Sequence, residues 1–204
     1  MKTDSHRADL RLDRLLKTFG LRDTLLAKHA RIADEMQEPS PSPFAAPLLH
    51  LVLWQPEIPP NTGNVARLAA ALDLPLHLVG PLGFVLTERR LLRAGLDYWD
   101  KVRLIRHAGP ADFWQAHPSP PAWYFTTKGR RTFWDANFEP GDFLFFGSES
   151  HGLPDELLST HPDRCLRIPH GPGVRSLNLA NCTAIAAYEA LRQFRSRGDP
   201  ARIG

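Results

Sequence analysis

From residue 48 onward, short apolar runs alternate with amphipathic stretches, which is the pattern of strands followed by helices. Strands are predicted at residues 48–54, 76–79, 102–105, 122–126, 143–146 and 165–168. Helices are predicted after Asn61 or Thr62, and at residues 88–94, 111–117, 154–159 and 178–195. The run 143–146 is so apolar that we expect it to be buried on both faces. The alternation predicts an α/β fold, a mainly parallel sheet with helices on both faces.

The helix that follows Thr62 has one apolar face, because its apolar residues recur at i, i+3, i+4 and i+7. These residues are Val65, Leu68, Ala69 and Leu72. Asn64 and Arg67 are three residues apart on a different face, where both can reach back over the preceding loop. We therefore treat Asn64 and Arg67 as candidate functional residues.

The first 46 residues have a different pattern of charged and apolar residues from the rest of the chain. Acidic and basic residues alternate around spaced leucines, which predicts one or two amphipathic helices, and a proline-rich linker follows them. We therefore divide the chain into an N-terminal extension, 1–46, and a domain, 47–204. An RNA-binding arm or a dimer contact are roles open to the extension, but packing on the domain or plain mobility is the simpler interpretation.

Composition narrows the class of protein. The chain has 204 residues and a net charge of +3, which permits a polyanionic partner without requiring one. Two cysteines are too few for a disulfide framework, and the nine histidines show no metal-binding spacing, so we expect no metal. No apolar run reaches the length of a membrane span, and no signal peptide precedes the domain. We expect a soluble, cytoplasmic protein.

Three loops that follow predicted strands carry the candidate chemistry. They span residues 55–67, 146–154 and 168–178, and neither a dinucleotide fingerprint nor a phosphate-binding P-loop is among them. The last two, with residues 125–129, offer backbone donors and acceptors next to apolar side chains. That mixture suits a flat heteroaromatic ligand such as an adenine. Parallel α/β sheets bind ligands at the carboxyl ends of their strands, which is where these loops lie.

The loops together resemble a known family. Asn61-x-Gly-Asn-x-x-Arg67, Phe-Gly-Ser-Glu-x-x-Gly-Leu-Pro154 and Arg-Ser-Leu-Asn178 are similar, in order and spacing, to the three motifs of the SPOUT class of RNA 2′-O-methyltransferases. The string Gln-Pro-Glu-Ile-Pro-Pro-Asn-Thr-Gly-Asn64 resembles the small TrmL branch, which modifies cytidine or uridine 34 of tRNA. The likeness covers residues 48–194 and leaves the N-terminal extension unexplained.

The resemblance implies a C-terminal deep trefoil knot, S-adenosylmethionine as cofactor, tRNA as substrate and a homodimer whose active site takes residues from both subunits. The C-terminal helix, whose alanines could pack closely against a second helix, is consistent with a dimer. Carried over by motif, the cofactor-binding residues are Phe125, Gly147, Ile168, Ser176 and Leu177.

The same resemblance assigns catalysis to Arg67, with Asn64 in support and Ser176 and Asn178 shaping the site. A guanidinium pKa above about 12 makes Arg67 a poor general base. We therefore expect it to clamp ribose and phosphate. Glu149 has two open roles, capping the next helix or contacting RNA.

Other functions compete with this one. A 2′-O-methyltransferase for another tRNA or rRNA site is the nearest alternative. A serine hydrolase is suggested by Ser150, which lies between a buried strand and a helix in a sequence like a nucleophile elbow. A non-catalytic RNA-binding module is the third, with a basic surface that includes Lys128, Arg130 and Arg131.

Overall fold

The computed structural model describes residues 47–85 and 99–198. The helices expected in the N-terminal extension and at 88–94 lie outside these ranges, and the division of the chain into 1–46 and 47–204 stays a prediction.

A parallel sheet of seven strands forms the centre of the described domain, in the order β3-β2-β1-β6-β4-β7-β5. Every strand pair in it is parallel. The strands are β1 (Leu49–Trp54), β2 (Leu76–Val79), β3 (Leu104–His107), β4 (Ala122–Phe125), β5 (Arg131–Thr132), β6 (Asp142–Phe146) and β7 (Cys165–Arg167). Because all strands point the same way, their carboxyl ends lie along one edge, where the predicted loops begin.

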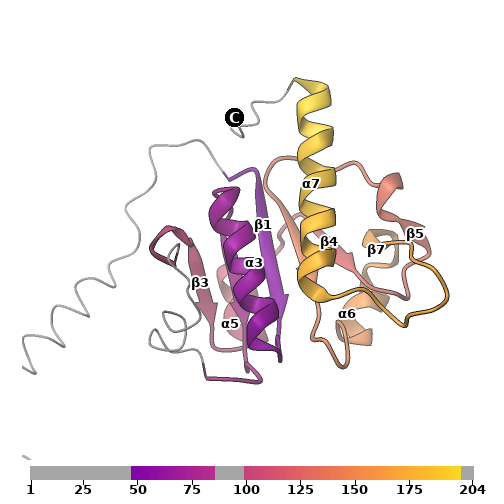
Figure 1. The fold of residues 1–204 in the computed structure, drawn as a ribbon. Helices are drawn as coiled ribbons and strands as arrows, with labels where there is room; N and C mark the ends of the chain where they lie inside the picture. Colours follow the sequence, from indigo (N-terminus) through magenta and orange to yellow (C-terminus); the bar gives the residue numbers. More distant parts are fainter. Residues whose placement is uncertain (1–46, 86–98, 199–204) are drawn as a thin grey trace, which may run out of the picture. The chain divides into compact units, whose positions relative to one another are not determined.

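Helices cover both faces of this sheet (Figure 1). On one face lie α3 (Pro59–Ala71) and α7 (Leu179–Arg197), and on the other α5 (Pro110–Ala116) and α6 (Asp155–Thr160). Three short 3-10 helices, η1 (Trp99–Lys101), η2 (Phe133–Asp135) and η3 (Pro162–Arg164), lie in the connections. The predicted α/β architecture is confirmed. The trefoil knot stays a prediction.

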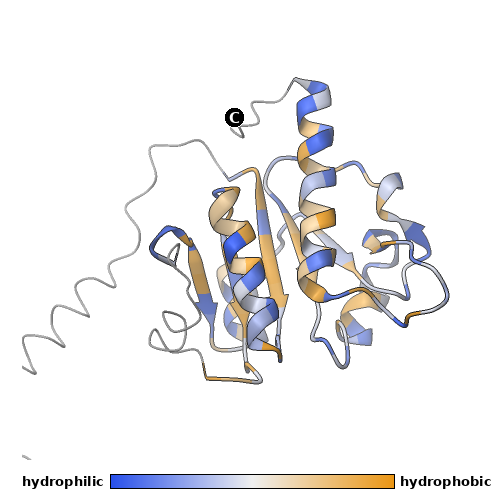
Figure 2. Ribbon diagram, in the orientation of Figure 1, coloured by the Kyte–Doolittle hydropathy of each residue, from blue (hydrophilic) through white to orange (hydrophobic). Residues whose placement is uncertain are grey.

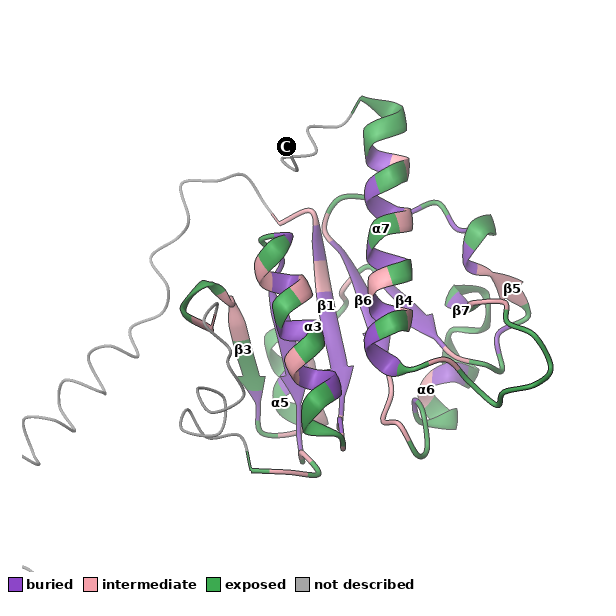
Figure 3. Cartoon of the chain, in the orientation of Figure 1, coloured by how far each residue is buried: buried purple, intermediate pink, exposed green. Residues whose placement is uncertain are grey.

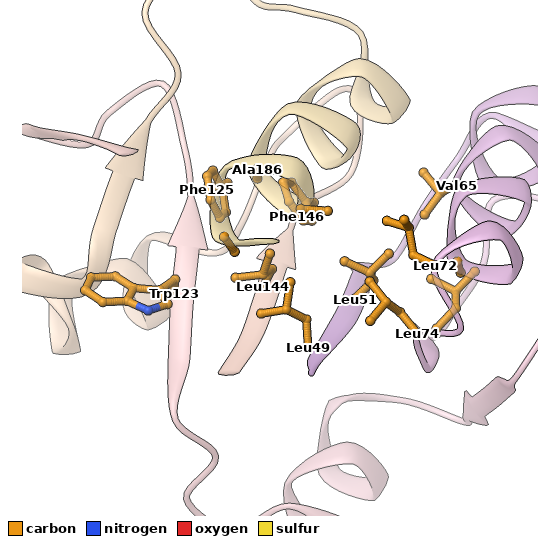
Figure 4. Close-up of a cluster of buried hydrophobic side chains, with 14 of the residues drawn as sticks. Leu49, Leu51, Val65, Leu72, Leu74, Trp123, Phe125, Leu144, Phe146 and Ala186 are labelled. Atoms are coloured by element: carbon orange, nitrogen blue, oxygen red, sulfur yellow. The ribbon is translucent and has the colours of Figure 1, made fainter. Parts of the chain in front are cut away.

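Two hydrophobic clusters sit on the two faces. The larger joins the sheet to α3 and α7 and includes Leu51, Val65, Leu144 and Ala186, which Figure 4 shows converging between strands and helices. The smaller, under α5 and α6, includes Phe113 and Phe145, among others. Strand β1 is mostly orange in the hydropathy view of Figure 2, and strands β1, β4 and β6 are almost wholly buried in Figure 3, as is β2. All five residues of β6 are buried, as its composition predicted.

Three local predictions need correction. Helix α3 begins at Pro59 and not after Thr62, since proline is favoured at the first helical position, so Asn61 and Thr62 are buried inside the helix and cap nothing. Strand β3 begins two residues later than predicted, because η1 occupies the preceding turn. Strand β5, only two residues long, gave no apolar run to detect.

The start of α7 is as predicted. Asn178 is its N-cap, and the Asn178 Oδ1 atom accepts hydrogen bonds from the backbone nitrogens of Ala180 (2.9 Å) and Asn181 (3.3 Å). The helix ends at Gly198, whose φ of 77° is the left-handed conformation that favours glycine. The Asn178 cap, at the other end of the helix, fixes the direction in which α7 leaves the loop 168–178.

Candidate active site

A cavity of about 470 Å³ opens at the carboxyl ends of β4, β6 and β7, beside the first turn of α7. All five residues predicted to bind a cofactor line it: Phe125, Gly147, Ile168, Ser176 and Leu177. They come from three separate chain segments, which the sheet order brings side by side. Ile58 and Asn61 of the loop 55–67 also line the cavity, so the three loops meet in one place.

The strand ends explain the apolar part of the cavity wall. Phe125 is the last residue of β4, and Phe146 is the last of β6, the strand that pairs with it. Their rings stack with centroids 4.8 Å apart. Ile168 directly follows β7 on the other side of β4. Apolar side chains and the backbone of strand ends thus share one wall, a mixture that suits a flat heteroaromatic ring.

The loop after β6 is folded back tightly on itself. Ser148 and Gly152 pair across it, and the Gly152 backbone nitrogen donates to the Ser148 carbonyl at 2.9 Å. A Cβ atom at Gly147 would lie 1.9 Å from the carbonyl carbon of Gly152, so only glycine fits there. The consecutive residues 147–153 therefore all lie on the cavity wall.

Side-chain hydrogen bonds connect three loops that are distant in sequence. Asn178 Nδ2 donates to Asn61 Oδ1 at 2.8 Å, and Asn61 Nδ2 donates to Glu149 Oε1 at 2.8 Å. The other Glu149 oxygen accepts from the Glu57 backbone nitrogen at 2.9 Å. We call this chain of contacts the Asn178–Asn61–Glu149 network. It ties the start of α7, the start of α3 and the β6 loop around one side of the cavity.

The network shows what sequence reasoning missed. Asn61 was interpreted as a helix cap, and its presence in the first motif was the only signal of a further role. Glu149 does not cap α6, which begins at Asp155 with Pro154 as N-cap and no side-chain cap. Its hydrogen bonds instead join loops within the chain, and its contact with RNA stays a prediction.

Ser150 is hydrogen-bonded to a carboxylate. Its Oγ atom donates to Glu57 Oε2 at 2.6 Å, and its backbone nitrogen donates to the same oxygen at 3.1 Å. These bonds lower the pKa of the Glu57 carboxyl. The nearby His151 has its Nδ1 atom 3.6 Å from Glu57 Oε1. A hydrolase would need an imidazole to take the serine proton, and here the Ser150 hydroxyl is directed at Glu57 instead.

Arg67 and Asn64 are placed differently from the cofactor residues. Both are exposed on α3, while Val65, Ala66 and Ala69 of the same helix are buried. Neither Arg67 nor Asn64 lines the cavity of its own chain. The prediction that they reach back over the loop into the site is therefore not met within one chain.

Two cationic side chains, a histidine and a thiol complete the lining. Lys128, His170 and Arg175 border the cavity, and Lys128 forms an ion pair with Asp155. Burial raises the pKa of the Cys182 thiol, which also lines the cavity, to about 11. Cationic side chains at the opening suit a phosphate-bearing partner.

Residues 48–188 match the model of the SpoU rRNA Methylase family. The chain belongs to this family. A tRNA (cytidine(34)-2′-O)-methyltransferase of Acidovorax sp. is 47% identical over 153 residues, which cover 72% of this chain and 92% of that protein.

Solved structures of the SpoU rRNA Methylase family agree with this assignment. One, described as giving structural insights into the 2-OH methylation of C/U34 on tRNA, is 52% identical, with a TM-score of 0.68. The alignment covers 73% of this chain and 97% of that one. An AdoMet-bound rRNA methyltransferase from Sinorhizobium meliloti is 25% identical, with a TM-score of 0.61, over 78% of this chain and 59% of that one.

Membership of the family confirms the resemblance that the three motifs indicated. The matched residues include the whole cavity and exclude the first 47 residues. Within the described ranges, no helix is both long and apolar enough to cross a membrane.

Proposed function

We propose that this protein transfers the methyl group of S-adenosylmethionine to the ribose 2′-hydroxyl of nucleotide 34, a cytidine or modified uridine, of tRNA. The observation that carries the proposal is the convergence of Phe125, Gly147, Ile168, Ser176 and Leu177 on one cavity. Relatives that cover the same residues at 47% and 52% identity act on, or are described in terms of, position 34 of tRNA.

The cavity suits the cofactor in size and in chemistry. About 470 Å³ is within the range of small-molecule pockets, about 300–1,000 Å³. In our proposal the apolar wall of Phe125 and Ile168 contacts the adenine, and backbone groups near Gly147 and Leu177 bind its polar edge. Residues of the Asn178–Asn61–Glu149 network hold the loops in place and are positioning residues.

The reaction needs alignment more than acid–base chemistry. The methyl group of a sulfonium is already electrophilic, so the enzyme must place the ribose oxygen in line with the methyl–sulfur bond and stabilise the emerging alkoxide. The C–S bond breaks as the C–O bond forms, and the hydroxyl proton leaves to solvent or a nearby base. Arg67 would clamp ribose and phosphate through its guanidinium and so lower the pKa of the hydroxyl.

Because Arg67 and Asn64 lie outside the cavity of their own chain, we infer that a second copy of the protein supplies them. Two large apolar side chains on α7 support a contact between copies, Ile185 (38% exposed) and Tyr188 (55% exposed). Both side chains lie on the helix whose first turn borders the cavity. A contact between copies through them would therefore place the second subunit beside the cavity. A homodimer with shared active sites is therefore part of the proposed function.

The proposal is tested by incubating the purified protein with unmodified tRNA and radiolabelled S-adenosylmethionine, followed by mapping of the modified nucleotide. We expect one 2′-O-methyl group at position 34. Label at another tRNA position, or in rRNA only, would replace the proposed substrate and keep the enzyme class. Cofactor binding by calorimetry without transfer to any RNA would instead support a binding module.

Arg67→Ala is expected to keep S-adenosylmethionine binding and the thermal unfolding temperature, because the side chain is exposed and outside the cavity. Transfer should fall by at least about 100-fold, since a charged clamp on the reacting ribose is lost. Arg106→Ala, at another exposed arginine of the described residues, serves as the control and should transfer normally. Wild-type rates in Arg67→Ala would remove Arg67 from the mechanism.

A further inference from the structure

A cluster of histidines lies on the sheet face covered by α5, away from the cavity. His50, His77 and His107 come from the adjacent strands β1, β2 and β3, and His117 is the residue that ends α5. His77 and His107 are buried, and His117 is half-buried. None of the four lines the cavity, so the proposed methyl transfer makes no use of them.

Three of these rings bring nitrogen atoms close together. One ring nitrogen each from His77, His107 and His117 lies within 4.8 Å of the other two. The shortest contact is between His77 Nδ1 and His107 Nε2, at 3.0 Å. The Phe113 and Phe143 rings pack against the cluster and give it an apolar surround.

The remaining nitrogens of two rings have partners of their own. His77 Nε2 is 2.9 Å from His50 Nδ1. His107 Nδ1 is 3.9 Å from Asp112 Oδ2. Histidines that bind a metal usually donate their second ring N–H to a carboxylate, a carbonyl or another acceptor, which fixes the tautomer and the ring orientation. His50 is placed to do this for His77, whereas Asp112 lies near the second nitrogen of His107 beyond hydrogen-bond distance and accepts from the Ala108 backbone nitrogen at 2.9 Å.

We propose that His77, His107 and His117 bind a Zn²⁺ ion through His77 Nδ1, His107 Nε2 and one nitrogen of His117. Three imidazoles are a ligand set that suits zinc, and water takes the fourth position, since no other His, Cys, Asp or Glu of the described residues joins the group. Protons then sit on His77 Nε2 and His107 Nδ1, facing His50 and Asp112.

The ion would compete with a hydrogen bond. The 3.0 Å contact between His77 Nδ1 and His107 Nε2 is also the length of an N–H···N bond, in which a proton lies between the two nitrogens. Zn–N bonds of about 2.0–2.1 Å require the two rings to move slightly apart and tilt toward the ion. A chain of hydrogen-bonded neutral histidines is therefore the alternative that the experiment must separate from a metal site.

The site would have a structural role. It joins the second and third strands to the end of α5, a helix of seven residues whose N-cap, Gly109, provides no side-chain hydrogen bond. The ligands are far apart in sequence and form no short motif, which explains why the scattered histidines predicted no metal.

The test uses full-length protein stripped of metal with a chelator and titrated with Zn²⁺ by calorimetry. We expect one saturable ion per chain, with His117→Asn abolishing saturable binding. His161→Asn, the same change at an exposed histidine outside the cluster, should bind as the wild type does. His50→Asn should weaken binding by about 10–100-fold, the usual effect of removing a partner that orients a ligand.

Two measurements on the wild-type protein also separate a metal site from a hydrogen-bonded chain of histidines. Co²⁺ in place of Zn²⁺ should produce the visible absorption of a tetrahedral site, and Zn²⁺ should shift the ring-nitrogen NMR signals of His77 and His107. Absence of saturable binding, or equal binding by His117→Asn and the wild type, would overturn the proposal in favour of the hydrogen-bonded chain. Methyl transfer is not a readout, so failure here would leave the proposed function untouched.

Discussion

At the scale of single residues, the shape of the cavity depends on a few positions where another side chain would not fit or would lose its hydrogen bonds. Gly147 is the clearest case, because a Cβ atom at this position would overlap the backbone of Gly152. The motif that contains Gly147 could be recognised in the sequence. The sequence did not show which glycine of the motif packs against the backbone of another residue. Asn61 is similar, since the sequence showed an amide near a helix start and the structure shows an amide between Asn178 and Glu149.

Gly147→Ala is expected to lower the free energy of unfolding by at least about 3 kcal/mol and to abolish cofactor binding. The added methyl group would overlap the backbone carbon of Gly152 at 1.9 Å, so the loop must open. Gly171→Ala is the control, because nothing lies within 4 Å of a Cβ there. Urea denaturation and calorimetry measure both effects, and near-wild-type binding in Gly147→Ala would contradict the loop geometry.

The two cysteines should react slowly with iodoacetamide at pH 8. Burial raises the pKa of Cys182 to about 11 and raises that of Cys165 too, so the thiolate is scarce until the pH rises well above the ordinary value for cysteine. Labelling of Cys182 should therefore accelerate with pH up to about 11 and become fast once the chain is unfolded. Mass spectrometry gives the rates, and fast labelling of the folded protein at pH 8 would contradict this.

At the scale of elements, the amphipathic and apolar patterns predicted the sheet and most helices. The predicted element boundaries were wrong where local structure overrode the hydrophobic pattern, as at Pro59 and η1. The start of α7 was predicted correctly because asparagine is a residue type that favours the N-cap, and Asn178 does cap the helix. The same side chain also donates to Asn61, a second role that only packing could reveal.

Exchanging Asn178 separates its two roles. Asn178→Asp keeps an oxygen for the α7 backbone nitrogens but loses the amide that donates to Asn61, whereas Asn178→Ala loses both. We expect the alanine variant to be less stable than the aspartate variant by about 1 kcal/mol, the usual worth of an N-cap. Cofactor affinity should fall in both. Asn181→Ala, an exposed neighbour, should change neither, and equal stability of the two Asn178 variants would argue against the cap.

At the scale of the whole molecule, the predicted cofactor residues and the predicted catalytic residues are separate within one chain. The predicted cofactor residues line the cavity, while Arg67 and Asn64 are exposed outside it. In the proposed homodimer, exposed Ile185 and Tyr188 on α7 would provide the apolar surface of the contact between copies.

Tyr188→Glu is expected to convert the protein to a monomer in analytical ultracentrifugation, because a charge would be buried in the contact. Methyl transfer should be lost with it, while the unfolding temperature of the isolated chain changes little, since Tyr188 is 55% exposed. Arg195→Glu, on the exposed last turn of the same helix, should remain dimeric and active. A Tyr188→Glu monomer with full activity would show that one chain suffices.

The sequence by itself determined the fold class, the order of strands and helices, and the family, because periodicity and ordered motifs are local properties of the chain. Through the motifs that contain them, it also selected five of the residues that line the cavity. Only the tertiary structure decided that Arg67 is outside its own cavity, that Asn61 connects loops, and that three scattered histidines converge. The physical reason is that these relations depend on strand order and packing, which bring together side chains that no interval in the sequence connects.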